Sequence, residues 1–144
     1  MGFPQNGPLF RSSSGLSPDW QDYTPTLTGF GTPSGVDFSF IVIGKLLLVR
    51  GNFSSGTPTA TEARCSLPTG YTSSNTALPA VSLCGYATWN FNSPNIPTIL
   101  IEANVAYLTF GAQGTSLTGL TKLNGDAYLG AGQGISFFAA VPVQ

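Results

Sequence analysis

The fold is decided by the stretch GKLLLVRGNFSSGTPTATEARCSLP, which covers residues 44–68. Residues 45–53 are rich in Leu and Val, a composition that favours a β-strand. Residues 62–67 alternate polar and apolar side chains, as expected of a second, shorter strand with one buried face. The residues between the two runs, SSGTPTAT, contain a glycine, a proline and no bulky apolar side chain, so they form a loop.

Similar apolar runs recur along the rest of the chain, with turn residues at a spacing of about 8–12 residues. Strands are expected at residues 20–27, 37–43, 45–53, 62–67, 80–91, 98–102, 105–110, 116–120 and 135–143. Pro25 limits the first strand to a sheet edge, and the strand at 80–91 is expected to carry Leu83 and Ala87 on one face. Asn124–Gly125 favours a tight type I′ turn, and the glycines of residues 130–134 indicate another turn.

The pattern predicts an all-β chain, a single antiparallel β-sandwich resembling a jelly roll, over residues 20–144. Residues 1–19 contain prolines, glycines and a run of serines without periodicity, which indicates an irregular, extended N-terminal arm. No window shows helical spacing over three turns.

The two strands at 37–43 and 45–53 are apolar on both faces. One face carries side chains expected in the core: Phe38, Phe40, Leu47 and Val49. The opposite face is also apolar: Ile41, Ile43, Leu46 and Leu48. An antiparallel sheet that meets water on one side is normally polar there, so we expect these four residues to form a subunit interface.

Composition supports association of the chain with itself. The 144 residues fit one domain, and only 8% of them are charged, against about 25% in an ordinary soluble protein. The formal net charge is −1 and no basic patch exists, which argues against nucleic acid as a partner. The sequence contains no run of 18 apolar residues, so no membrane-spanning helix is predicted.

The chain has no histidine, which excludes a Ser–His–Asp triad, a Cys–His pair and most zinc sites. Paired carboxylates remain the one catalytic arrangement available, but Glu62 is expected to pair with Arg64 on the same strand face. Cys65 and Cys84 match no metal-binding spacing, and we expect two buried thiols, with a single disulfide as the alternative. No catalytic residue, metal site or cofactor is therefore predicted.

Aromatic side chains are the one binding signal in the sequence, since exposed rings recur at sugar-binding and protein-binding surfaces. The candidates for receptor contact are Tyr71, Tyr86, Trp89 and Tyr128. The alternative for Trp89 is a place in the core.

The run FSSGTPTATEARCSLPTGYT, residues 53–72, resembles a segment of the small β-rich tip domains of bacteriophage tail fibres and related virion proteins. The resemblance extends upstream to WQDYTPTLTGFGTP, residues 20–33, and more loosely downstream to GQGISFFAAVPV, residues 132–143. It implies a β-sandwich that trimerises on the particle surface, and its motifs are structural.

Together these observations predict a non-enzymatic phage virion protein, made in the host cytoplasm and placed on the virion surface as a homotrimer. Because the chain starts at its own Met1 with a short arm, we expect a head decoration (cement) protein that binds other virion proteins of the capsid. The arm would anchor it to the particle through Phe3, Leu9, Phe10 and Arg11. The alternatives are a receptor-binding tail-fibre tip, docked on the tail and contacting a host surface receptor, and a free lectin.

Overall fold

The structure is a computed structural model that describes residues 19–78, 81–89, 96–113 and 119–144. The anchor residues Phe3, Leu9, Phe10 and Arg11, and all of the expected arm except Asp19, lie outside the described residues. So does most of the strand expected at 116–120. The described elements follow the chain in the order β1 (Gln21–Tyr23), β2 (Leu27–Thr28), β3 (Ser34–Ile43), β4 (Leu46–Ser54), β5 (Arg64–Ser66), β6 (Ser82–Trp89), β7 (Ile96–Ile101), β8 (Tyr107–Gln113), β9 (Leu120–Lys122), α1 (Gly125–Tyr128) and β10 (Gly134–Pro142).

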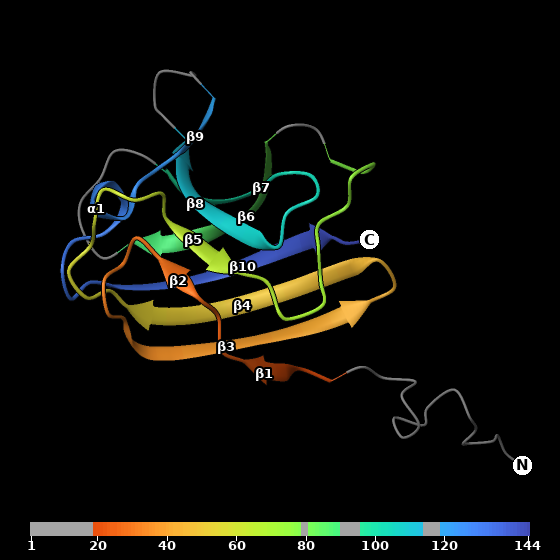
Figure 1. The fold of residues 1–144 in the computed structure, drawn as a ribbon, viewed down its shortest axis with the longest axis horizontal. Helices are drawn as coiled ribbons and strands as arrows, with labels where there is room; N and C mark the ends of the chain where they lie inside the picture. Colours follow the sequence, from red (N-terminus) through yellow and green to blue (C-terminus); the bar gives the residue numbers. More distant parts are fainter. Residues whose placement is uncertain (1–18, 79–80, 90–95, 114–118) are drawn as a thin grey trace, which may run out of the picture.

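The strands form one antiparallel sheet in the order β1-β3-β4-β10-β6-β7-β8-β5-β2, with β9 paired to β8. The sheet curls over itself, as Figure 1 shows, so the predicted all-β, antiparallel, sandwich-like fold is confirmed. The layers of the sandwich are parts of one continuous sheet.

The curl is closed by the short segment between β1 and β2, which lie at opposite ends of the strand order. The Thr26 amide donates a hydrogen bond of 2.8 Å to Ser66 Oγ, and the Tyr23 hydroxyl donates one of 3.2 Å to the Ser66 carbonyl oxygen. Pro25 lies between the two short strands and is buried. Its ring cannot donate to a ladder, so the strand expected at 20–27 is split and both halves are edge strands.

The interior of the curl is filled by aromatic rings. Phe110 is at their centre, with ring centroids 5.1 Å from Phe30, 5.3 Å from Tyr128 and 5.5 Å from Phe137. These pairs meet edge to face, the arrangement that aromatic quadrupoles prefer. The side chains predicted for the core are buried, as expected: Phe38, Phe40, Leu47 and Val49.

The prediction that Tyr128 contacts a receptor is wrong, because its side chain is completely buried. The local backbone explains the error. A type I′ turn needs positive φ at both central residues, but Asn124 has φ −76° and is followed by the single turn of α1. That turn directs Tyr128 against Phe110, and burial raises the pKa of its hydroxyl above the ordinary value.

The outward and inward positions of β6 also differ from the expected alternation. Its pairing with β7 shifts register between Leu83 and Gly85, which marks an irregularity of the β-bulge type. Leu83 is therefore exposed, whereas Cys84 and Ala87 pack against the core. The expectation that Leu83 and Ala87 share a face is wrong for this reason.

Candidate functional site

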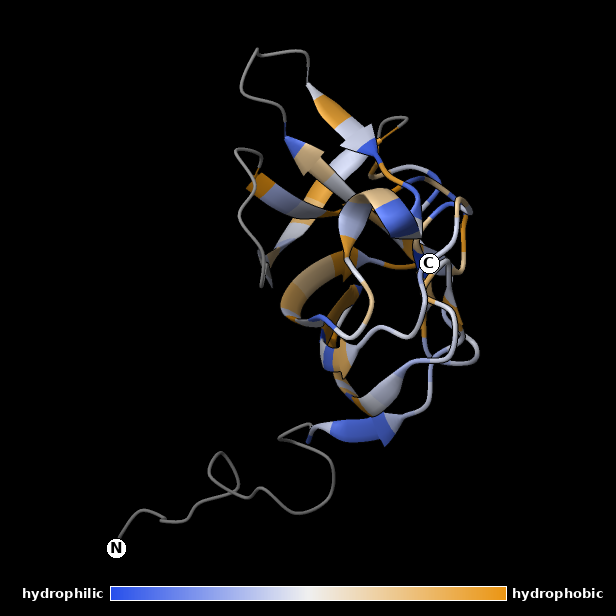
Figure 2. Ribbon diagram, turned by 90° about the vertical axis from the view of Figure 1, so that its left-hand side faces the viewer, coloured by the Kyte–Doolittle hydropathy of each residue, from blue (hydrophilic) through white to orange (hydrophobic). Residues whose placement is uncertain are grey.

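The outward-facing side of β3, β4 and β10 has an apolar end. The register of the three strands aligns Ile41 with Leu48 and Ala140, and Ile43 with Leu46 and Pro142. We define the apolar half of this outer face as the side chains of these two rows together with their apolar neighbours on β10 and β6. Its members are Ile43, Leu46, Leu48, Leu83, Tyr86, Phe138 and Ala140. Figure 2 shows the apolar colouring of the curled strands, in contrast to the hydrophilic β1.

Three of the four residues predicted for the subunit interface lie in this apolar half. Ile43 and Leu46 are exposed and Leu48 is half-buried. Ile41, by contrast, is buried within the single chain, so its predicted place in an exposed interface is wrong. Gln21 pairs with Phe40, and the next residue back, Trp20, therefore comes alongside Ile41 at the sheet edge.

Phe138 is the central side chain of the apolar half. It is 48% exposed and lies between Arg50 of β4 and Tyr86 of β6 in the cross-strand register. A shallow groove of about 470 Å³ is lined by Leu83, Cys84, Gly85, Tyr86, Phe138 and Ala140. The sequence carries a signal for Phe138, because two successive phenylalanines in a strand, Phe137 and Phe138, must point to opposite faces.

The other end of the same face is polar. Asp22 pairs with Ser39 and Ser39 with Arg50, while Asp37 pairs with Asn52 and Asn52 with Ser136. We call these six side chains the polar half of the outer face. Trp20 marks the boundary between the halves, because its ring lies against Phe138, with centroids 6.5 Å apart, and under the Arg50 guanidinium.

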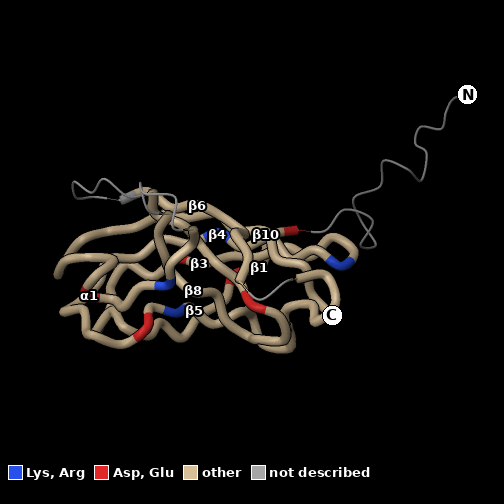
Figure 3. The backbone as a smooth tube through the Cα atoms, turned by 90° about the horizontal axis from the view of Figure 1, so that it is seen from above, with Lys and Arg blue, Asp and Glu red and all other residues tan. Residues whose placement is uncertain are grey.

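A separate charged cluster lies around β5, β8 and β9. Arg64 Nε is 2.6 Å from Glu62 Oε1, which confirms the predicted pair. Lys122 Nζ bridges to a second carboxylate, at 3.3 Å from Glu62 Oε2 and 2.8 Å from Glu102 Oε2. Figure 3 shows how few other charges the fold carries.

The cluster lowers the pKa of the Glu62 carboxyl. Partial burial alone would raise that pKa, but the hydrogen bonds from Arg64 and Lys122 and their positive charges outweigh burial. A general acid needs the opposite shift, toward neutral pH. The arrangement of Glu62 and Glu102 around Lys122 therefore suits ion pairing between strands.

The remaining aromatic candidates have different surroundings. Tyr86 is 55% exposed at the rim of the groove, so it is available for contact. Tyr71 is half-buried, with its ring centroid 5.8 Å from that of Phe40. Trp89 ends β6, and its side chain lies outside the described part of the structure.

The described residues lack two further features. Among them, no group of three or more His, Cys, Asp or Glu side chains is arranged to hold a metal ion. The only helix among them has a single turn, and none is long and apolar enough to cross a membrane.

These features define a curled, all-β, antiparallel domain with a large outward face that is divided into an apolar and a polar half. No protein-family model matches the chain, and no curated protein matches it in sequence. Its fold is similar to part of the Dettilon tailspike protein, with a TM-score of 0.62 and 14% sequence identity. The match covers 88% of this chain and 24% of that protein, so the chain spans about a quarter of its length.

Proposed function

We propose that the chain is a non-enzymatic structural domain of a phage particle, a homotrimer that buries the apolar half of the outer face between subunits. The single observation that carries the proposal is the exposure of large apolar side chains on one face. Ile43, Leu46, Leu83, Tyr86 and Phe138 each remain 38–55% exposed.

Burial of this face would stabilise an assembly. Full burial of a large apolar side chain contributes about 1.5–3 kcal/mol, and about half of each of these side chains remains to be covered. A soluble monomer rarely exposes such a contiguous patch, and the chain has few charges with which to keep it in solution. The number of subunits, three, comes from the family resemblance. A three-fold ring would use a heterologous contact that closes on itself.

Our first candidate for its place is the tail, and the likeness of the fold to part of a tailspike supports a structural or tail protein of a phage. A domain of this kind would be one module of a longer spike or fibre, with virion proteins and a host surface as its contacts. The head-decoration role, with an anchoring arm, is the second candidate. An enzymatic role is not proposed, because histidine is lacking and Glu62 and Glu102 are both ion-paired.

The oligomeric state tests the proposal. We expect the purified chain to be a trimer by light scattering and native mass spectrometry at micromolar concentration. Phe138→Asp and Tyr86→Asp each place a charge in the apolar half and should give monomers or aggregates. The matched control is Val36→Asp, because Val36 is 40% exposed but lies at the other end of β3, beside Asp22 and Tyr23.

Circular dichroism of each variant separates loss of association from loss of folding. A wild-type chain that stays a soluble monomer would contradict the proposed interface, as would equal effects of Val36→Asp and Phe138→Asp. Labelling of the chain on intact particles by electron microscopy distinguishes the two placements: a tail signal supports the tail module, and a signal on the capsid supports decoration.

A further inference from the structure

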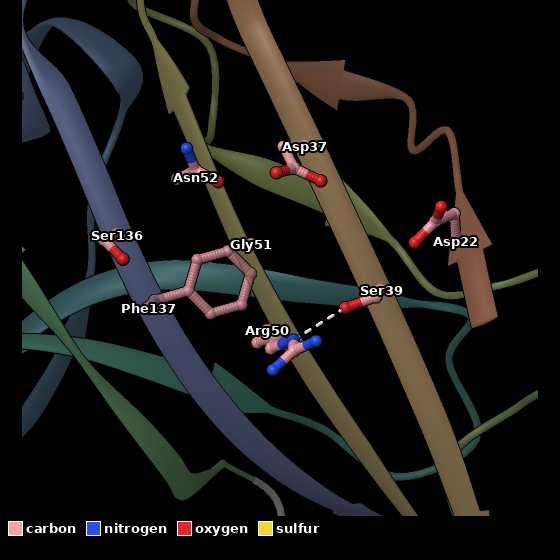
Figure 4. Close-up of a pocket in the computed structure, with 8 residues that line it drawn as sticks. All are labelled: Asp22, Asp37, Ser39, Arg50, Gly51, Asn52, Ser136 and Phe137. Atoms are coloured by element: carbon pink, nitrogen blue, oxygen red, sulfur yellow. Dashed lines mark hydrogen bonds between the residues drawn. The ribbon is translucent and has the colours of Figure 1, made fainter. Parts of the chain in front are cut away.

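The two ends of the strand order are joined by one short segment, residues 20–28, which we call the strap. Its first part, β1, lies along the edge of β3, where Asp22 is opposite Ser39 (Figure 4). Its second part, β2, pairs with β5 at the other end of the sheet, where Leu27 is opposite Cys65. The strap therefore crosses the seam between the two ends of the curled sheet.

Three hydrogen bonds between the strap and β5 converge on Ser66. Its hydroxyl oxygen accepts the bond from the Thr26 amide, and its own amide donates one of 3.0 Å to the Thr26 carbonyl oxygen. Its carbonyl oxygen accepts the bond from the Tyr23 hydroxyl. Pro25, which lies between Tyr23 and Thr26, has no amide hydrogen to donate. The closure of the seam therefore depends strongly on one residue of β5.

The strap has little buried surface of its own. Its two strands have three and two residues, whereas the central strands β4 and β10 have nine residues each. Among residues 20–28 only Pro25 is buried, and the others are half-buried or exposed. Segments with few buried contacts and solvent-exposed hydrogen bonds open at a lower free-energy cost than long internal strands.

We propose that the strap opens as a unit while the rest of the sheet stays folded, so that the seam is a built-in point at which the curl opens. Opening lifts Tyr23 and Leu27, which pack against the core in the closed form, away from Cys65. It also frees the edges of β3 and β5, and an unpaired strand edge accepts a strand from another chain. The opening belongs to the single chain and does not require the proposed assembly.

Trp20 holds the strap at its other end. Its ring packs on Arg50 and Phe138 on the outer face, and the next residue along the chain begins β1. Loss of the ring should therefore favour the open form without any change at Ser66. Trp20 and Ser66 are two separate attachments of the same segment, and each can be removed alone.

The two cysteines allow the opening to be measured. Cys65 is completely buried, and its Sγ lies 3.9 Å from the Tyr23 hydroxyl oxygen. Cys84 lies on β6, where its Sγ donates a hydrogen bond of 3.4 Å to the Ile99 carbonyl oxygen of β7, away from the seam. Opening of the strap uncovers Cys65 and leaves the surroundings of Cys84 as they are, so Cys84 is an internal control.

The test treats the full-length chain with iodoacetamide under native conditions and measures the labelling rate at each cysteine by peptide mass spectrometry. The measurement is repeated at urea concentrations below the unfolding transition, which circular dichroism locates. Opening of a short segment exposes little surface, so the rate at Cys65 should rise only weakly with urea. Unfolding of the whole chain exposes far more surface and would give a steep rise.

Three variants remove one attachment each: Tyr23→Phe, Ser66→Ala and Trp20→Ala. Each should speed the labelling of Cys65 about three- to tenfold and leave the rate at Cys84 unchanged, since one such contact contributes about 0.5–1.5 kcal/mol, which is that fold-change in the open population. Thr88→Ala is the matched control, because it removes a hydroxyl that bonds Ser136 at 3.3 Å across β6 and β10. It should leave Cys65 at the wild-type rate.

Labelling of Cys65 that rises with urea as steeply as unfolding of the whole chain would overturn the proposal. So would wild-type rates in all three strap variants, or equal acceleration at Cys65 and Cys84, because either result shows that the strap does not open separately. The oligomeric state of the same samples tests the proposed function, so failure of one is distinguishable from failure of the other.

Discussion

The guanidinium carbon of Arg50 lies 4.1 Å from the centroid of the Trp20 ring, and this contact joins the first described residues of the chain to the middle of the outer face. The Trp20 ring also contacts the ring of Phe138, at an interplanar angle of 68°. Trp20 therefore packs on two strands that are distant from it in sequence, β4 and β10. The boundary between arm and domain that the sequence predicts at residue 20 stays a prediction.

Loss of the Trp20 ring should destabilise the domain without unfolding it. A partly exposed cation–π contact contributes about 0.5–1 kcal/mol and an aromatic pair about 0.5–1.5 kcal/mol beyond buried area. We expect Trp20→Ala to lower the free energy of unfolding by about 1–2 kcal/mol in urea denaturation, and Trp20→Phe to lower it by less. A shortened chain that begins at Trp20 should remain folded; its unfolding would show that residues 1–19 belong to the core.

Much of the fold follows from side-chain alternation, as particular residues show. Phe38, Phe40, Leu47 and Val49 are buried where their two-residue period places them, and Pro25 interrupts a strand where its missing amide requires it. Side-chain alternation gives the wrong face for Leu83, because a register shift changes which side chains of β6 point outward. No turn residue in the sequence indicates this shift. At Asn124 and Gly125 a tight turn is replaced by a helical turn that begins at Gly125 with Asn124 as its N-cap, since packing of Tyr128 in the core overrides local preference.

The candidate sites were harder to predict than the core. The sequence pattern predicts the apolar outer positions Ile43, Leu46 and Leu48. Each lies in a strand whose opposite face is also apolar, and this can be read from the sequence of that strand alone. The polar half of the outer face combines β1, β3, β4 and β10, and β10 is about 80 residues from β4 in sequence. The register that brings Ser136 beside Asn52 is a tertiary property that local patterns do not contain.

Close backbone contact at Gly125 gives a second prediction. A Cβ atom there would collide with the carbonyl oxygen of Gly29, which is backbone and cannot rotate away. We expect Gly125→Ala to cost at least about 2 kcal/mol in unfolding free energy, at the upper part of the range for overpacking. Gly130→Ala is the matched control, because its Cβ would meet only the flexible Gln133 side chain, 3.1 Å away. Equal stability of the two variants would contradict the close approach of α1 to Gly29.

The charged cluster makes the free energy of unfolding depend on pH. The pKa of Glu62 is lowered in the folded chain from its ordinary value of 4.5, so the ionised carboxylate stabilises the fold above that pH. This contribution is lost as the pH falls through the lowered value, because protonation breaks the contacts with Arg64 and Lys122. Since the pair is partly exposed, we expect only about 0.5–1 kcal/mol.

Denaturation at a series of pH values measures this dependence. Glu62→Gln should flatten the fall in unfolding free energy below pH 4.5, whereas Asp126→Asn, which changes a carboxylate outside the cluster, should keep the wild-type profile. A Glu62→Gln profile parallel to that of the wild type over this range would rule out the cluster as its source.

The two thiols should be inert in the folded chain. Both cysteines are free, and burial raises the pKa of Cys65 and of Cys84 to about 12. For Cys65 a hydrogen bond with the Tyr23 hydroxyl opposes this rise only in part. Because the thiolate is the reactive form, alkylation by iodoacetamide at neutral pH should be at least about a hundredfold slower in the native chain than in the unfolded chain, as followed by mass spectrometry.

The unfolded chain is the control for reagent and pH, and replacement of both cysteines by alanine should cost about 1–3 kcal/mol of packing energy in total. Rapid native alkylation would contradict the burial of these side chains, and a thiol signal that appears only after reduction would reveal a disulfide instead.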